Sequence, residues 1–201
     1  NHVRLQGCFA FDHLSWLSGA PDHPAPTPGA VAEEVLAADP LLAGFTLTTW
    51  SGQLFVEAAR RVREKRPDMP LIAGGPLATC LGADLADEDS PFDAVVSGYG
   101  EVPFATILEA FVGADPGRDL PVGLAETGGI YLRAAGGGVG QPPEHRSDPG
   151  IDILPSPYVE GTVSMGGSPS MLVAWCRGCA GRCAYCAWHN QLPRAIPASL
   201  R

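Results

Sequence analysis

The chain has 201 residues, of which 45% are hydrophobic, so it can bury an ordinary core in one large or two small domains. Its formal net charge is -9, from 13 basic and 22 acidic residues, and its single lysine is Lys65. This composition argues against a surface that follows nucleic-acid phosphates and against a lysine-dependent phosphate loop. No apolar run reaches the ~18 residues of a bilayer span, and no signal peptide is recognisable. We therefore expect a cytoplasmic protein with no membrane association and no nucleic-acid partner.

From residue 28 onward, predicted helices alternate with predicted buried strands. Thr27 followed by Pro28 predicts the start of a helix that stops at residues 39–40. The apolar run at 41–49 is typical of a strand covered on both faces. The same patterns predict an amphipathic helix around 55–62 that ends before Pro67, a strand at 70–73, a weaker helix at 77–85, a strand at 92–96, and a helix at 104–111 with Pro103 in its first turn.

Strands separated by helices of this length predict a doubly wound α/β domain with a parallel sheet, over about residues 1–125. Ligands of such sheets bind outside the carboxyl ends of the strands. Those ends are residues 46–50, 74–77 and 97–101. Two of the three turns are rich in glycine, which either lets backbone approach a bulky ligand or simply forms a tight turn.

The strand and helix alternation is lost over residues 113–170, which we interpret as a linker with one hairpin, in which residues 130–133 are a candidate strand. Residues 171–175 then predict a buried strand that leads into a cysteine cluster. The predicted domains are therefore 1–125, a linker at 126–170, and a further domain that starts at 171–201. Two isolated cysteines, Cys8 and Cys80, are predicted to be buried thiols.

The other four of the six cysteines lie within eleven residues, which favours metal ligation over a disulfide framework. Cys179, Cys183 and Cys186 have Cys-x3-Cys-x2-Cys spacing. Three thiolates can hold three irons of a 4Fe-4S cluster and leave the fourth iron open to another ligand. Counting Cys176 gives four thiolates, which would also suit a zinc knuckle, although zinc ribbons separate their cysteine pairs by more residues.

This spacing, with Tyr185 before the last cysteine, resembles the radical S-adenosylmethionine superfamily. Further segments resemble its cobalamin-binding branch, in the same order, and the resemblance covers nearly all of residues 28–189. These segments are Gly44-Phe45-Thr46 with Trp50, the run 72–76, the run 95–101, the run 154–158 and Arg177-Gly178-Cys179. Tyr99 departs from the glutamate often found at its position.

The resemblance implies a Rossmann-like cobalamin-binding domain that precedes the start of a partial (β/α) radical S-adenosylmethionine barrel. It implies that Cys179, Cys183 and Cys186 hold the 4Fe-4S cluster and that Tyr185 contacts S-adenosyl-L-methionine. The implied cobalamin contacts are Thr48, Thr49, Trp50, Gly74, Gly75, Pro76, Ser97, Gly98, Tyr99, Gly100 and Glu101.

None of the five histidines lies in the Asp-x-His-x-x-Gly sequence that supplies a cobalt ligand in many cobalamin proteins. The resemblance therefore implies cobalamin whose lower face receives no protein nitrogen, with Trp50 or its neighbours packed beneath or beside the corrin. The alternative for Trp50 is an ordinary core aromatic residue.

The function implied is that of a cobalamin-dependent radical S-adenosylmethionine enzyme. Above all it implies methyl transfer to an unactivated carbon of a small-molecule or peptide substrate, through a 5'-deoxyadenosyl radical and methylcobalamin. The alternatives are oxidative cyclisation or rearrangement without methyl transfer, and a non-catalytic cobalamin-binding or zinc-knuckle module. A flavodoxin or ferredoxin is the implied electron donor. Because the chain starts at Asn1 and stops 15 residues after Cys186, we expect an inactive N-terminal fragment with no assignable catalytic residue.

Overall fold

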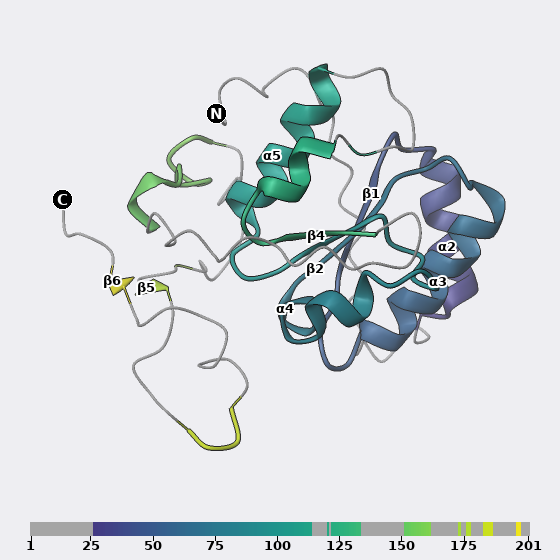
Figure 1. Cartoon of the computed structure of the whole chain (residues 1–201), viewed down its shortest axis with the longest axis horizontal. Coiled ribbons are helices and arrows are strands. Elements are labelled where there is room, and N and C mark those ends of the chain that lie inside the picture. The colour runs from purple at the N-terminus through teal and green to yellow at the C-terminus, as the bar shows by residue number, and fades with distance from the viewer. Residues whose placement is uncertain are drawn as a thin grey trace. The chain divides into compact units, whose positions relative to one another are not determined.

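The structure is a computed structural model, shown in Figure 1, and it describes residues 26–113, 120, 122–133, 151–161, 173, 176–177, 183–186 and 196–197. The chain divides into two compact units, one over Val3–His145 and the other over Arg146–Arg201. In the part of the chain that the structure describes, no helix combines the length and the apolar character that a bilayer crossing needs.

The first unit is built on a four-stranded sheet with the strand order β1-β2-β3-β4. Strands β1 (Ala43–Thr46), β2 (Leu71–Gly74) and β3 (Ala94–Val96) are parallel, and β4 (Ile130–Leu132) pairs antiparallel with β3. The predicted α/β unit with a mostly parallel sheet is thereby confirmed. A doubly wound sheet reverses its strand order, and no reversal occurs among these four described strands, so that detail stays a prediction.

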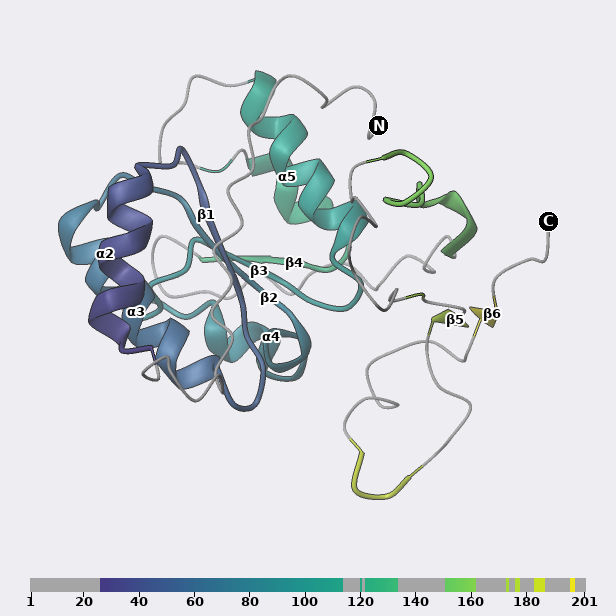
Figure 2. The same cartoon turned by 180° about the vertical axis from the view of Figure 1, so that it is seen from behind.

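Helices cover both faces of this sheet, as Figures 1 and 2 show. Helices α2 (Pro28–Ala38), α3 (Gly52–Lys65) and α4 (Pro76–Leu81) contribute to a core on one face, and α5 (Glu101–Gly113) contributes to a core on the other. Along β2, Leu71 and Ala73 join the first core while Ile72 joins the second. Because both faces of β2 are covered, its sequence is a continuous apolar run.

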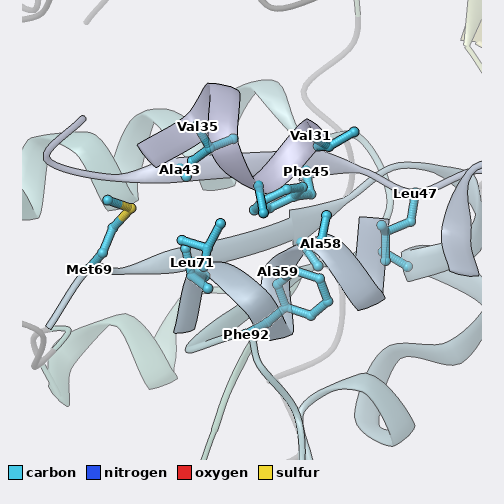
Figure 3. Packing of buried hydrophobic residues seen from close by; sticks show 14 of the residues in the cluster. Val31, Val35, Ala43, Phe45, Leu47, Ala58, Ala59, Met69, Leu71 and Phe92 are labelled. Carbon is cyan, nitrogen blue, oxygen red and sulfur yellow. The ribbon is translucent and has the colours of Figure 1, made fainter. Parts of the chain in front are cut away.

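The larger core lies between β1, β2 and the helices α2 and α3 (Figure 3). The rings of Phe45 and Phe92 lie with their centroids 5.9 Å apart and tilted by 59°, a favourable aromatic arrangement. Met69 and Leu71 continue this core toward the amino end of β2.

The two longest helices of this core, α2 and α3, begin and end close to where the sequence predicts. The Thr27 hydroxyl accepts a hydrogen bond from the amide of Ala30 at 3.2 Å, which caps α2. Helix α3 ends at Lys65, before Pro67, as predicted.

A buried carboxylate, Asp93, ties the amino ends of the strands together. Its side chain is 8% exposed and forms ion pairs with Arg63 of α3 and, at 2.7 Å, with Arg133 just after β4. It also accepts a hydrogen bond from the Leu71 amide at 2.9 Å. Arg63 donates further hydrogen bonds to the carbonyls of Pro67, Met69 and Pro91. The network therefore joins α3, β2, β3 and β4 at one end of the sheet.

The strand predicted at 41–49 is longer and more buried than the strand observed. Strand β1 covers 43–46, and its residues alternate between buried and exposed, with Gly44 and Thr46 exposed. The prediction of coverage on both faces is wrong because the core on the second face is built on β2, β3 and β4 and includes no residue of β1.

The weak helix predicted at 77–85 is two elements, α4 and a 3-10 turn at Gly82–Leu85. They are separated where Gly82 adopts a φ of 42°. Cys80, predicted to be buried, is exposed, because α4 has six residues and buries only Ala78.

The candidate strand at 130–133 is confirmed as β4, but it belongs to the main sheet rather than to a hairpin in a linker. The sheet therefore includes residues beyond the predicted domain boundary at 125. In the second unit, the described elements are a 3-10 turn at Ile151–Ile153 and a short antiparallel pair of β5 (Cys176–Arg177) and β6 (Ile196–Pro197). The strand predicted at 171–175 lies outside the described residues except for Val173, which is 43% exposed.

Candidate functional site

Three loops follow the carboxyl ends of the parallel strands β1, β2 and β3, and we call them the edge loops. They are residues 47–51, 74–77 and 97–101, counted here as the first, second and third edge loop. All eleven residues implied as cobalamin contacts lie in them. In a parallel sheet this edge is where ligands bind, so the structure brings the predicted residues to the expected place, while their contact with a cofactor stays a prediction.

Backbone hydrogen bonds join the first edge loop to the second. The amide of Leu47 donates to the Gly74 carbonyl at 2.7 Å, and the Leu47 carbonyl accepts from the Leu77 amide at 3.0 Å. Between these bonds Gly75 has φ 95° and ψ -178°, a conformation that is almost exclusive to glycine. A Cβ atom at Gly75 would lie 2.8 Å from the Leu47 carbonyl oxygen. Glycine at this position therefore permits both the backbone conformation and the close approach of the two loops.

The first edge loop is a turn closed by two hydroxyl groups. The hydroxyls of Thr48 and Ser51 lie 2.7 Å apart, and each also accepts a hydrogen bond from the other residue's amide at 3.2 Å. The turn leaves Trp50 with 85% of its surface exposed. The alternative that Trp50 is an ordinary core residue is therefore wrong. Thr49 is also exposed.

The third edge loop is anchored on both sides. Ser97 is 5% exposed and its amide donates to the Gly129 carbonyl at 2.8 Å, so this residue is the least open of the predicted contacts. Gly98 has a φ of 78°, and its amide donates to the hydroxyl of Thr79 at 2.9 Å. Thr79 was not predicted from the sequence. The available indication was its position four residues after Gly75, which places it one helical turn from the second edge loop.

The chemistry of the edge loops favours a large ligand without strong negative charge. The three loops contain no lysine or arginine, and their one charged residue is the exposed Glu101. They offer a tryptophan ring, hydroxyl groups and glycine backbone. A flat, largely apolar ligand with amide groups at its rim fits this set better than a phosphate-rich one, which needs cations or a run of free amides.

In the second unit, the structure describes two of the three cysteines predicted to bind the cluster. The amide of Cys186 donates to the Cys183 carbonyl at 3.0 Å, which forms a tight turn with both cysteines at its ends. Tyr185, the predicted S-adenosylmethionine contact, is 93% exposed within this turn. Cys179 lies outside the described residues, and among those that are described no group of three potential metal ligands is found. The three-cysteine site thus stays a prediction.

Residues 21–108 match the family described as B12 binding domain, and this segment includes all three edge loops. The α/β unit with its mostly parallel sheet fits a Rossmann-like domain of this kind. The chain is also similar to a protein of Streptantibioticus cattleyicolor called 2-(S-pantetheinyl)-carbapenam-3-carboxylate methyltransferase, with 27% identity over 172 residues. The similarity covers 79% of this chain but 23% of that protein, so the chain spans about a quarter of the length of the curated relative it matches.

Proposed function

We propose that this chain binds cobalamin on its edge loops and that it belongs to a cobalamin-dependent radical S-adenosylmethionine methyltransferase that acts on an unactivated carbon. The observation that carries the proposal is the exposure of Trp50, at 85%, on a loop within the segment that matches the B12 binding domain. A large aromatic side chain gains about 25 cal/mol for each Å² of apolar surface removed from water. A ligand that covers Trp50 would therefore be stabilised by it.

The residues of the edge loops fit a corrin. The Trp50 ring would contact the flat macrocycle beneath or beside it, and the hydroxyl of the exposed Thr49 would meet the amide groups at the rim. The glycine backbone at Gly75 and Gly98 would let the ligand approach the ends of β2 and β3 closely. Cobalamin, when bound, supplies a cobalt centre that carries and donates a methyl group.

The cysteine turn supports the second part of the proposal. Cys183 and Cys186 lie at the ends of one tight turn, and with Cys179 they would hold a 4Fe-4S cluster by three thiolates. When bound, the cluster would supply a single electron to S-adenosyl-L-methionine, whose reductive cleavage would give methionine and a 5'-deoxyadenosyl radical. Tyr185, exposed between these two cysteines, would contact that S-adenosyl-L-methionine. We propose a flavodoxin or ferredoxin as the source of the electron.

Methyl transfer is preferred to the other outcomes because of the curated relative. Its similarity covers 79% of this chain, whereas the B12 binding domain match, at residues 21–108, covers less than half. The similarity to a methyltransferase therefore extends into residues outside the cobalamin-binding segment. We propose a small-molecule or peptide substrate.

A titration with hydroxocobalamin tests the first part of the proposal. We expect the chain to retain about one corrinoid after gel filtration, and Trp50→Ala to bind about tenfold more weakly, a change of ~1.4 kcal/mol. The matched control is Leu41→Ala, because Leu41 is also an exposed apolar residue, at 71%, but lies before the amino end of β1. Failure of the wild-type chain to retain corrinoid refutes cobalamin binding, and equal loss in both variants refutes the role of Trp50.

Two spectroscopic and analytical measurements test the remaining parts. The electron paramagnetic resonance spectrum of the Co(II) form should lack nitrogen hyperfine splitting from a protein imidazole. Anaerobic reconstitution should give about four irons per chain, and Cys176→Ser should leave this iron content unchanged. Zinc in place of iron, or loss of iron in the Cys176→Ser variant, contradicts the three-cysteine cluster.

A further inference from the structure

Thr79 connects the second and third edge loops through its side chain. Its hydroxyl donates to the Gly75 carbonyl at 3.0 Å and accepts from the Gly98 amide at 2.9 Å. Gly75 belongs to the second edge loop and Gly98 to the third, so one hydroxyl group bonds to both. Thr79 itself lies in α4 and is half-buried, and it is not one of the predicted contacts.

The contact between the first and second edge loops is of a different kind. It consists of the two backbone hydrogen bonds of Leu47 with Gly74 and Leu77. Truncating a side chain removes neither the donor nor the acceptor of such bonds. The bond from the Gly98 amide to the Thr79 hydroxyl instead disappears when the hydroxyl is removed, which makes the position of the third edge loop sensitive to residue 79.

Loss of the hydroxyl would have an asymmetric effect on its two partners. The Gly75 carbonyl also accepts the backbone amide of Thr79 at 2.9 Å, so it keeps a hydrogen bond. The Gly98 amide would lose the acceptor that it has here. A half-buried amide without an acceptor is unfavourable, and Gly98, at a φ of 78°, has the conformational freedom of glycine to move away.

We infer that Thr79 is a positioning residue that sets the spacing between the second and third edge loops, and that the affinity for corrinoid depends on its hydroxyl. The inference rests on the proposed function, since it requires the edge loops to bind cobalamin. A rigid ligand that contacts several loops binds best when those loops are already spaced for it. Thr79 acts on the ligand through Gly75 and Gly98 and need not contact it.

The test compares hydroxocobalamin affinity in Thr79→Val, which keeps the shape of threonine without the hydroxyl, and in Thr79→Ser, which keeps the hydroxyl. We expect about tenfold weaker binding in Thr79→Val and a change of less than about threefold in Thr79→Ser. The matched control is Thr106→Val, because the Thr106 hydroxyl donates to the Val102 carbonyl at 3.0 Å within α5. That hydrogen bond spans four residues of one helix, as does the bond from Thr79 to Gly75, but it joins no loops, so the affinity of Thr106→Val should be unchanged.

A second readout, amide hydrogen exchange at Gly98, does not depend on the ligand. Exchange at Gly98 should be faster in Thr79→Val than in the wild type and in Thr106→Val. If Thr79→Val lacks a cooperative unfolding transition, Thr79→Ala takes its place, because it removes the hydroxyl without placing a methyl group against the Gly98 amide.

The outcomes separate this inference from the proposed function. A wild-type chain that binds no corrinoid overturns the proposed function and the dependent claim about affinity, while exchange at Gly98 still tests the hydrogen bond. Normal binding by the wild type with unchanged affinity in Thr79→Val overturns the inference alone. Equal loss of affinity in Thr106→Val overturns it too, because the effect would then be a general loss of helix stability.

Discussion

Substitution of Gly75 by alanine is the most direct test of how the edge loops are built. Alanine would have to adopt φ 95° and ψ -178°, a region essentially reserved for glycine, at a cost of about 1–3 kcal/mol. Its Cβ atom would also lie 2.8 Å from the Leu47 carbonyl oxygen and 3.0 Å from the Thr46 methyl group. Both neighbours belong to the end of β1 and the loop after it, so relief of the contact has to displace the first edge loop.

The two costs combine to a substantial destabilisation. Forcing an extra methyl group into a close-packed site costs about 1–3 kcal/mol, so we expect Gly75→Ala to lower the free energy of unfolding by about 2–6 kcal/mol in total. Domains of ordinary stability have about 5–15 kcal/mol. The variant should therefore lose a large part of its stability, and its affinity for corrinoid should fall with the displacement of the first edge loop.

Urea denaturation followed by circular dichroism measures this loss. For a slope of about 2 kcal/mol per molar urea, the midpoint should fall by about 1–3 M. The control is Gly44→Ala on β1. A Cβ atom there would meet nothing within 4 Å, and the φ of Gly44 is not positive. This control should be neutral or slightly more stable than the wild type. A Gly75→Ala chain with the midpoint of the wild type would refute the reasoning.

Three further predictions concern other parts of the chain. Asp93→Ala leaves two arginines without their buried carboxylate and should cost about 3–5 kcal/mol of unfolding free energy in the same assay; a loss below about 1 kcal/mol would contradict a structural role. Hydrogen bonds from Arg66 hold the pKa of Asp68 below its usual value. Any contribution of this pair to the stability of the fold is therefore present above about pH 4 and is lost as the pH falls through the folded-state pKa of Asp68. The midpoints of Asp68→Asn and wild type should therefore converge as the pH falls below about 4, and a gap that widens on acidification would reverse the expected sign. Cys186→Ser should lower the iron content of the reconstituted chain while Cys80→Ser leaves it unchanged, and equal iron in both variants would exclude Cys186 as a ligand.

Local sequence signals predicted much of the first unit because they act over a few residues. Thr27 with Pro28 located the start of α2, and Pro67 located the end of α3, since caps and prolines determine helix ends through nearby backbone groups. The apolar runs of β2 and β3 also predicted their burial, because both strands are covered on two faces.

The features that were predicted wrongly or not predicted depend on residues that are far away in the sequence. The sequence of β1 resembles that of β2, but β1 pairs with a single described strand and is exposed on one side. Strand β4 is too short to indicate that it would join β3, and its pairing is antiparallel across a gap of more than 30 residues. Thr79 became visible as part of the site only when the structure placed its hydroxyl between two loops from different strands.

The direction of β4 determines at which end the polypeptide leaves the main sheet. Ile130 pairs with Val96 near the edge loops and Leu132 pairs with Ala94, so the chain exits at the opposite side, next to Asp93. The carboxyl end of β4 and the edge loops therefore lie at opposite ends of the strands, separated by a distance on the order of 13 Å for a strand of four residues.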